Sequence, residues 1–302
     1  MSTSGGIVTN IHVGPAGWSY KDWTGIVYPR EPGRGFDSLS FVGRYFDLVE
    51  VNSSFYRLPE ARMVASWVRR THDTSLRFTF KLTRSFTHER GDVAQADRDA
   101  YLQGIAPAVQ AGKLGAILMQ FPWSFRNTPE ALEWIARLRD SFGQHPLVVE
   151  VRHASWDDPE TRERLQMLGI GFCNIDQPRL RGCLGPTAYR TSPIAYFRFH
   201  GRRADKWFTE NIQSHERYDY LYPEDELRPW VPRIREAGEG AEQVFVVANN
   251  HYRGQGPANA LQLRALIEGH PVNVPDTLLK AFPQLESVSV KPAGQSSLFG
   301  EW

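Results

Sequence analysis

Acidic, basic and amide side chains follow several short apolar stretches of this sequence. Residues 147–156, Leu-Val-Val-Glu-Val-Arg-His-Ala-Ser-Trp, begin as an apolar run and become ionic with no turn residue between. Side chains alternate faces along a strand, so Glu150 and Arg152 share one side while Val149 and Val151 share the other. A buried carboxylate and guanidinium need partners from neighbouring strands. Such groups could transfer protons or stabilise an anionic substrate.

Six further apolar stretches repeat this pattern. Their polar residues, usually two positions apart, are Glu50 and Asn52, Thr79 and Lys81, Gln120, Asn174 and Asp176, Arg198 and His200, and Asn249 and His251. With a first strand expected over 12–15, the strands recur at intervals of roughly 20 to 50 residues, and helical patterns separate most of them. This order predicts an α/β protein with a single (β/α)8 TIM-like barrel, whose functional residues gather at the C-terminal ends of the strands.

The length and composition fit one domain without a broad basic surface. A barrel needs about 250 residues, so most of the 302 residues are used by it. We expect an N-terminal arm over 1–10, a barrel domain over 11–285 and a C-terminal tail over 286–302. The segment 177–193 is rich in Gly and Pro, so the sixth helix should be missing or irregular. The net charge of +1 means that any affinity for phosphate must be local.

Targeting and cofactor motifs are not apparent in the sequence. The first residues lack a charged region followed by an apolar core, and no apolar run reaches the length of a membrane span. We therefore expect a cytoplasmic protein that does not contact the membrane. Cys173 and Cys183 are the only cysteines; Cys173 should face the helices, and neither cysteine has a metal-type spacing. No nucleotide-cofactor motif is seen, so the cofactor stays unknown.

Ordered motifs along the chain resemble the YecE-like family, domain of unknown function 72. The motifs are GPAGWSY (14–20), EVNSSFYRLP (50–59), FKLTR (80–84) with TH (87–88), QFP (120–122), EVRH (150–153), RFHG (198–201) and NNHY (249–252). Ser54 and Ala248 depart from the family pattern, where Thr and a bulky Phe are usual. The resemblance implies a TIM-barrel-like fold and no established reaction, because barrels host many functions.

The charged residues at the strand ends are candidate catalytic groups. They comprise Glu50, Glu150 and Asp176, the cations Lys81, Arg152 and Arg198, and the histidines His200 and His251. One alternative is an ionic network that only fills the barrel, although a lumen is usually filled by branched apolar residues. A divalent metal on the histidines and carboxylates is a second alternative, which we do not favour because the three cations would crowd it.

Phosphate binding is predicted at two loops. Barrels often bind phosphate through the loops after strands seven and eight. The first loop contains Gly201, Arg202 and Arg203, and the second, Gly254-Gln255-Gly256, opens a helix whose free N–H groups attract anions. The alternative is that the glycines only make turns and the arginines are solvated.

Further polar and aromatic residues near the same rim are predicted to contact the substrate. They are Trp18, Tyr20, Asn52, His88, Gln120, Asn174, Asn249 and Asn250. Lys81 could instead form a Schiff base with a carbonyl substrate, provided that its amine is desolvated. The competing interpretation keeps Lys81 charged beside Glu50 or a phosphate.

The C-terminal sequence suggests a partner. Gln295, Leu298 and Phe299 resemble the short peptide by which bacterial replication and repair proteins bind the DNA sliding clamp, or they pack on their own barrel. Our leading hypothesis is an enzyme that acts on a phosphate-containing substrate, a nucleic acid or nucleotide, by a hydrolytic reaction linked to DNA maintenance. The alternatives are a noncatalytic nucleic-acid or metabolite-binding protein that docks through its tail, and a sugar-phosphate isomerase or lyase.

Overall fold

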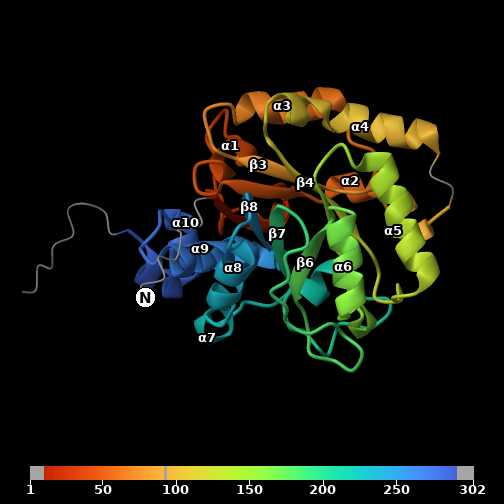
Figure 1. The fold of residues 1–302 in the computed structure, drawn as a ribbon. Coiled ribbons are helices and arrows are strands. Elements are labelled where there is room, and N and C mark those ends of the chain that lie inside the picture. The colour runs from red at the N-terminus through yellow and green to blue at the C-terminus, as the bar shows by residue number, and fades with distance from the viewer. Residues whose placement is uncertain (1–9, 92–93, 291–302) are drawn as a thin grey trace, which may run out of the picture.

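In the computed structural model, which describes residues 10–91 and 94–290, eight parallel strands form a nearly closed barrel with helices outside it (Figure 1). The strands are β1 (Ile11–Pro15), β2 (Leu48–Val51), β3 (Arg77–Lys81), β4 (Leu114–Gln120), β5 (Leu147–Glu150), β6 (Gly171–Asp176), β7 (Ile194–Phe199) and β8 (Gln243–Ala248). Their order in the sheet is β1-β8-β7-β6-β5-β4-β3-β2. The predicted α/β TIM-like barrel is confirmed.

The barrel closes where β1 meets β2. A parallel bridge joins Ala16 to Glu50, and Gly17 N donates to Glu50 O at 2.8 Å. A Cβ added to Gly14 would lie only 1.8 Å from Leu48 O, so a residue with a side chain would separate the two strands. Closure therefore depends on a glycine in β1.

The helices that cover the barrel begin and end at recognisable signals. They are α1 (Ser38–Val42), α2 (Ser53–Tyr56), α3 (Ala61–Arg70), α4 (Gln95–Gln110), α5 (Pro129–Phe142), α6 (Pro159–Met167), α7 (Glu224–Leu227), α8 (Trp230–Gly238), α9 (Gln255–Glu268) and α10 (Asp276–Ala281). Thr128 caps α5 and Asp158 caps α6, each followed by Pro at the first helical position. Residues 177–193 contain no helix, as their Gly and Pro content predicted.

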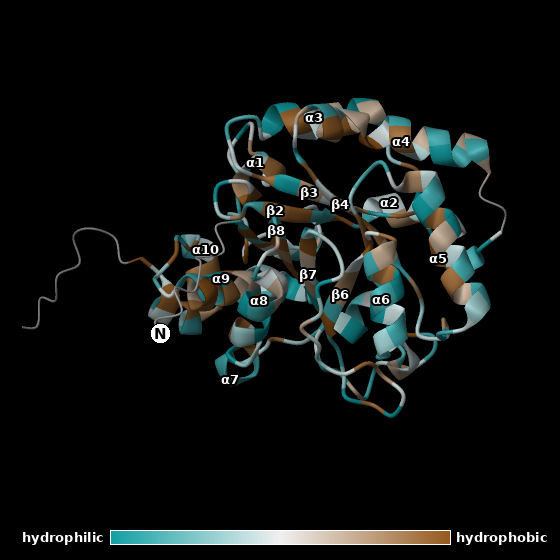
Figure 2. Cartoon of the chain, viewed as in Figure 1, coloured by the Kyte–Doolittle hydropathy of each residue, from teal (hydrophilic) through white to brown (hydrophobic). Residues whose placement is uncertain are grey.

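The core lies on both faces of the strands. Hydrophobic colour follows the strands and parts of the helices packed around them (Figure 2), and most strand residues are buried. After α9, helix α10 and the 3-10 helix η6 (Pro283–Val288) return to the barrel and bury Leu278 and Leu285. Among the helices of 10–91 and 94–290, none combines the length and apolar character needed to cross a membrane. Most of the predicted N-terminal arm, and Gln295, Leu298 and Phe299, lie outside the described residues.

Candidate functional site

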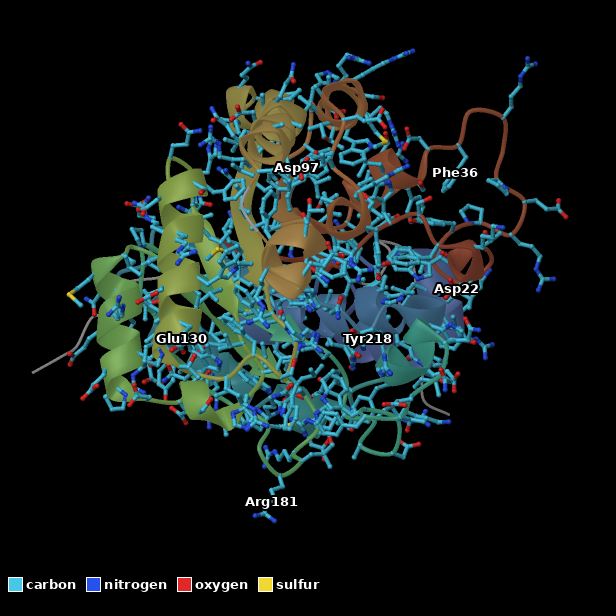
Figure 3. The ribbon with its side chains drawn as sticks, turned by 90° about the vertical axis from the view of Figure 1, so that its right-hand side faces the viewer. Asp22, Phe36, Asp97, Glu130, Arg181 and Tyr218 are labelled. Carbon is cyan, nitrogen blue, oxygen red and sulfur yellow. The ribbon has the colours of Figure 1, made fainter. Side chains whose placement is uncertain are left out.

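A cavity of about 600 Å³ opens at the C-terminal ends of the strands, and we call it the mouth pocket. Eight predicted site residues line it, namely Trp18, Tyr20, Asn52, Lys81, His88, Gln120, Asn249 and His251. The remaining lining residues are Gly17, Ser19, Ser53, Phe55, Tyr56, Arg217 and Tyr218. Figure 3 views the molecule with Tyr218 near its centre. The structure therefore brings together residues from six separate parts of the sequence.

Among the residues that line this pocket, Lys81 has the pKa that is shifted furthest from its usual value. It ends β3, and Nζ lies 5.6 Å from the centre of the Phe55 ring. Nζ makes no hydrogen bond or ion pair with any residue that the structure describes. Burial, aided by the nearby Arg198, lowers the pKa of Lys81 to about 7, although Glu50 and Glu150 oppose this. A fraction of the Lys81 amines is thus unprotonated at neutral pH.

The described lining of the mouth pocket carries positive but no negative side chains. Lys81 and Arg217 are its cations, and neither Asp nor Glu is among its residues. Close by, Nη2 of Arg152 is buried and has no hydrogen-bond partner within the described part of the chain. Unpaired buried donors of this kind favour an anionic ligand.

Below the pocket, Glu50, Glu150, Arg152, Arg198 and His200 form a network that we call the buried charged layer. Arg198 lies between the two carboxylates, with Nη2 2.6 Å from Glu50 Oε1 and Nη1 bonded to Glu150 Oε2. Arg152 Nε donates to Glu150 Oε1 at 2.9 Å. Arg198 and both carboxylates are fully buried. The charges of this layer are therefore used largely within the protein.

Hydrogen bonds from the uncharged side chains of Tyr196, Thr79 and Asn249 complete the layer. Tyr196 donates its hydroxyl proton to Glu50 Oε2 at 3.0 Å, and Thr79 Oγ1 lies 2.9 Å from the same hydroxyl. Asn249 Nδ2 donates to His200 Nδ1 at 2.9 Å, while His200 Nε2 lies 3.2 Å from Glu150 Oε1. Thus Asn249 belongs to the pocket lining and also contacts the layer beneath it.

Burial and pairing act in opposite directions on the pKa values of this layer. Burial alone raises the pKa of Glu150, but Arg198, His200 and Arg152 outweigh it and hold the pKa well below its usual value. Burial lowers the pKa of His200 to about 3, even though Glu150 favours its protonation. Glu150 is therefore ionised and His200 neutral at pH 7.

Comparison with known proteins identifies the family. The family model described as "Protein of unknown function DUF72" matches residues 12–284. The chain belongs to this family. YunF of Bacillus subtilis (strain 168) is 27% identical over 272 residues, which cover 85% of this chain and 95% of YunF. YecE of Escherichia coli (strain K12) is 30% identical over 174 residues, covering 55% of this chain and 59% of YecE.

Solved structures of DUF72 proteins share the barrel. A DUF72 protein from Thermotoga maritima MSB8 is 35% identical with a TM-score of 0.76, covering 86% of this chain and 99% of that one. A DUF72 protein from Enterococcus faecalis V583 is 25% identical with a TM-score of 0.75, covering 85% and 95%. The resemblance to the YecE-like family is confirmed, and it assigns no reaction.

In this DUF72 barrel the side chains of β6 face the opposite way from our prediction. Asn174 Nδ2 donates to Tyr189 O at 2.9 Å, and its Oδ1 accepts from Thr187 at 2.7 Å. Cys173 was expected to face the helices, but it is adjacent to Asn174 in the strand and therefore faces the lumen. Burial, with a contribution from the charge of Glu150, raises the pKa of its thiol well above the usual value. The prediction that Asn174 and Asp176 join the lumenal polar set is wrong.

Asp176 is the centre of a separate hydrogen-bond cluster. Its carboxylate accepts from Tyr222 Oη at 2.7 Å, from Trp230 Nε1 at 2.9 Å and from two nitrogens of Arg202 at 2.6 and 2.8 Å. Trp230 belongs to α8, so this cluster ties β6 to the helical layer. The sequence pattern did not show whether these side chains face the lumen or the helical layer. Polar partners for a strand end can come from either side.

The predicted phosphate loops do not line the mouth pocket. Arg202 pairs with Asp176 and Glu226, and Arg203 pairs with Asp205. The glycines Gly254 and Gly256 are buried. The remaining members of these loops and their neighbours are held by the protein: Gln255 donates to Asp219, and Asn250 donates to Tyr220 O and Asn259. Phosphate binding by these loops stays a prediction, and the ion pairs of Arg202 and Arg203 within the protein give it no support.

Arg217 and Tyr218 were missed by the sequence analysis. They belong to the 3-10 helix η4 (Ser214–Tyr218), within the long connection between β7 and α7. An aromatic residue beside an arginine was the available signal, but the sequence does not show where a long connection folds. Across the described ranges, no group of three or more His, Cys, Asp or Glu side chains is arranged to hold a metal ion.

Proposed function

We propose that this protein is an enzyme that acts on a small phosphate-bearing carbonyl compound in the mouth pocket, with the amine of Lys81 as the reacting group. The observation that carries the proposal is the state of Lys81. Its pKa is lowered to about 7 by burial, and its Nζ has no ionic partner among the described residues. A lysine in this state is a nucleophile at neutral pH, whereas an ordinary surface lysine is almost entirely protonated.

The reaction begins at the carbonyl carbon. The unprotonated amine of Lys81 attacks this carbon, and loss of the carbonyl oxygen as water leaves an imine. Once protonated, the imine withdraws electrons from the neighbouring carbon–hydrogen or carbon–carbon bond, which is the chemistry of an isomerase or a lyase. The isomerase or lyase that the sequence left as an alternative is thus the function best supported by the geometry.

The charge of the pocket supports an anionic substrate. Lys81 and Arg217 face the cavity and the unpartnered Nη2 of Arg152 lies near it, with no carboxylate in the described lining. A phosphate dianion would bind through Arg217 and Arg152 and leave Lys81 free for the carbonyl. Phosphoester hydrolysis has less support, because Glu50 and Glu150 are already paired with Arg198.

The proposal is tested by trapping the imine with borohydride. Dihydroxyacetone phosphate serves as the probe, and mass spectrometry of peptides locates the reduced adduct. We expect the adduct on Lys81, none in Lys81→Met, and wild-type labelling in Lys206→Met, a matched variant of a lysine paired with Glu216 outside the pocket. Uncharged dihydroxyacetone should label at least about tenfold more slowly if the pocket selects phosphate. Labelling spread over surface lysines would refute the proposal.

Binding of the probe without an adduct would favour the second candidate, a noncatalytic metabolite-binding protein. The specific observation behind this candidate is the aromatic lining, with Trp18, Tyr20 and Tyr218 around the cavity. Calorimetry with dihydroxyacetone phosphate, on wild type and Lys81→Met, separates the two: a binding protein would lose some affinity in the variant and form no covalent product in either.

We also propose, from the sequence alone, that the tail docks on a bacterial DNA sliding clamp through Gln295, Leu298 and Phe299. Two apolar side chains in a polar tail fit the pocket of a partner. Retention of the purified clamp by the intact chain but not by a chain ending at Gly294 is expected. Equal retention by both chains would remove this role, and with it the link to DNA.

A further inference from the structure

We infer that Nε2 of His251 is the proton acceptor of the mouth pocket, and that Asn249 positions it. The inference rests on the proposed function and adds to it the base that an isomerase or lyase needs. Three histidines lie in or below the pocket, namely His88, His200 and His251. The inference assigns the role of base to one of them, which the residue type alone cannot do.

The tautomer of His251 follows from its hydrogen bond. Nδ1 lies 3.1 Å from the main-chain oxygen of Asn249. A carbonyl oxygen only accepts, so Nδ1 must carry the hydrogen in this bond. In the neutral ring the lone pair is then on Nε2. Nε2 makes no hydrogen bond with the residues of the described ranges, and His251 lines the cavity, so this lone pair is free for a substrate.

The ring of His251 is held in place. Tyr20 stacks on it with 4.6 Å between ring centres and 17° between planes, and the Tyr218 ring lies 5.6 Å away. Trp23 Nε1 donates to the main-chain oxygen of His251 at 2.8 Å. The side chain of Asn249 is itself fixed by its hydrogen bond to His200. A general base is effective only when its orientation is fixed in this way.

The other two histidines are less suited to the role. His200 is completely buried, with Nδ1 bonded to Asn249 and Nε2 near Glu150, so it has no access to a substrate. His88 lines the pocket, but burial, with help from Arg152, lowers its pKa to about 4. A base that weak accepts a carbon-bound proton poorly at neutral pH.

His251 is neutral at pH 7. Burial lowers its pKa, and the charges of Lys81 and His215 act in the same direction. The bond to Asn249 and the negative charge of Asp22 raise it. These opposed effects leave the pKa below the usual value of 6.5. The lone pair is therefore available at the pH at which Lys81 is partly unprotonated.

The proton transfer balances without an external reagent. After the imine has formed on Lys81 and been protonated, the hydrogen on the neighbouring carbon passes to His251 Nε2 as a proton. The electron pair of the broken C–H bond becomes the C=C bond of an enamine, and the π electrons of the C=N bond move to the nitrogen. Return of the proton from the imidazolium to carbon restores His251, and hydrolysis of the imine restores the amine.

The test measures exchange of the carbon-bound hydrogens of dihydroxyacetone phosphate in D2O by proton NMR, together with borohydride trapping. His251→Asn is the informative variant. The Asn amide can still donate a hydrogen bond to Asn249 O, as Nδ1 does, but Asn has no atom equivalent to Nε2. We expect exchange to fall at least about 100-fold while Lys81 is still trapped at close to the wild-type rate. His270→Asn, a change of an exposed surface histidine, should leave both unchanged.

The possible outcomes separate the two claims. No trapping on wild-type Lys81 would overturn the proposed function together with this step. Trapping with undiminished exchange in His251→Asn would overturn only the role of His251. Nitrogen NMR of the free protein is a second test that needs no substrate: a His251 ring protonated on Nε2 at pH 7 would also overturn the inference, and a neutral ring protonated on Nδ1 is expected.

Discussion

Two polar regions lie one above the other inside the same barrel, and they use their polar atoms in opposite ways. In the buried charged layer, Arg198 contacts Glu50 and Glu150, and all three are fully buried. In the mouth pocket, Lys81 and His251 face a cavity of about 600 Å³, and neither Nζ nor Nε2 has a partner among the described residues. The layer supports the structure, and the pocket keeps its groups free for a ligand.

The comparison shows that polarity at a strand end does not by itself mark a reacting group. Glu150 and Lys81 both end a strand and both carry charge. Glu150 is satisfied by Arg198 and Arg152, whereas the positive charge of Lys81 is not compensated and its pKa falls. Substitutions in the layer should therefore change stability most, and substitutions in the pocket should change chemistry most.

The largest effect is expected when Arg198 is removed. Arg198→Met leaves two buried carboxylates without their shared cation, so the free energy of unfolding should fall by about 3–5 kcal/mol in urea denaturation. Arg217→Met, a pocket arginine, serves as the control and should cost at most about 1 kcal/mol. Equal losses in the two variants would contradict the division between layer and pocket.

A smaller loss is expected at the cluster on the outer side of β6. Asp176→Asn replaces a carboxylate that accepts from Tyr222, Trp230 and Arg202, so we expect a loss of about 1.5–3 kcal/mol. Calorimetric melting measures this loss. Labelling of Lys81 by dihydroxyacetone phosphate and borohydride should be unchanged below the melting transition, and its disappearance would place Asp176 back among the reacting groups.

Lys81→Met should stabilise the folded protein, whereas the two preceding substitutions should destabilise it. The folded-state pKa of Lys81, about 7, lies below the usual 10.5, so below pH 7 the folded protein bears the full cost of an unfavourable charge. We expect the variant to be more stable than wild type at pH 6. The difference should shrink as the pH rises from 7 toward 10.5, because the unfolded lysine then also loses its proton. A variant that is less stable at pH 6 would show that Lys81 belongs to the supporting layer.

The smallest change in stability is expected at Asn52. Its buried Oδ1 has no hydrogen-bond partner within the described part of the chain. Asn52→Ala should alter the free energy of unfolding by no more than about 0.5 kcal/mol. The probe concentration for half-maximal trapping should rise roughly fivefold, equivalent to about 1 kcal/mol for one lost hydrogen bond. A loss of stability without a change in trapping would contradict a binding role.

The sequence predicted the strands correctly, along with the side chains that six of them direct to the lumen or mouth. Glu50, Lys81, Glu150, Arg198 and His251 all lie in the barrel interior or at its mouth, as the alternation of polar and apolar residues indicated. The same reasoning failed for β6, because Asn174 and Asp176 find polar partners outside the barrel, and alternation does not say which face is the lumen.

Alternation of side chains and the spacing of Gly, Pro and helix-capping residues determined the barrel, because these are local properties of the chain. Which charges are neutralised was decided only by the tertiary structure. Arg198 meets Glu50 across 148 positions of sequence, and Arg217 reaches the pocket from a long connection. The reactivity of Lys81 likewise depends on the absence of a neighbouring carboxylate close enough to pair with it, which is a property of three-dimensional packing.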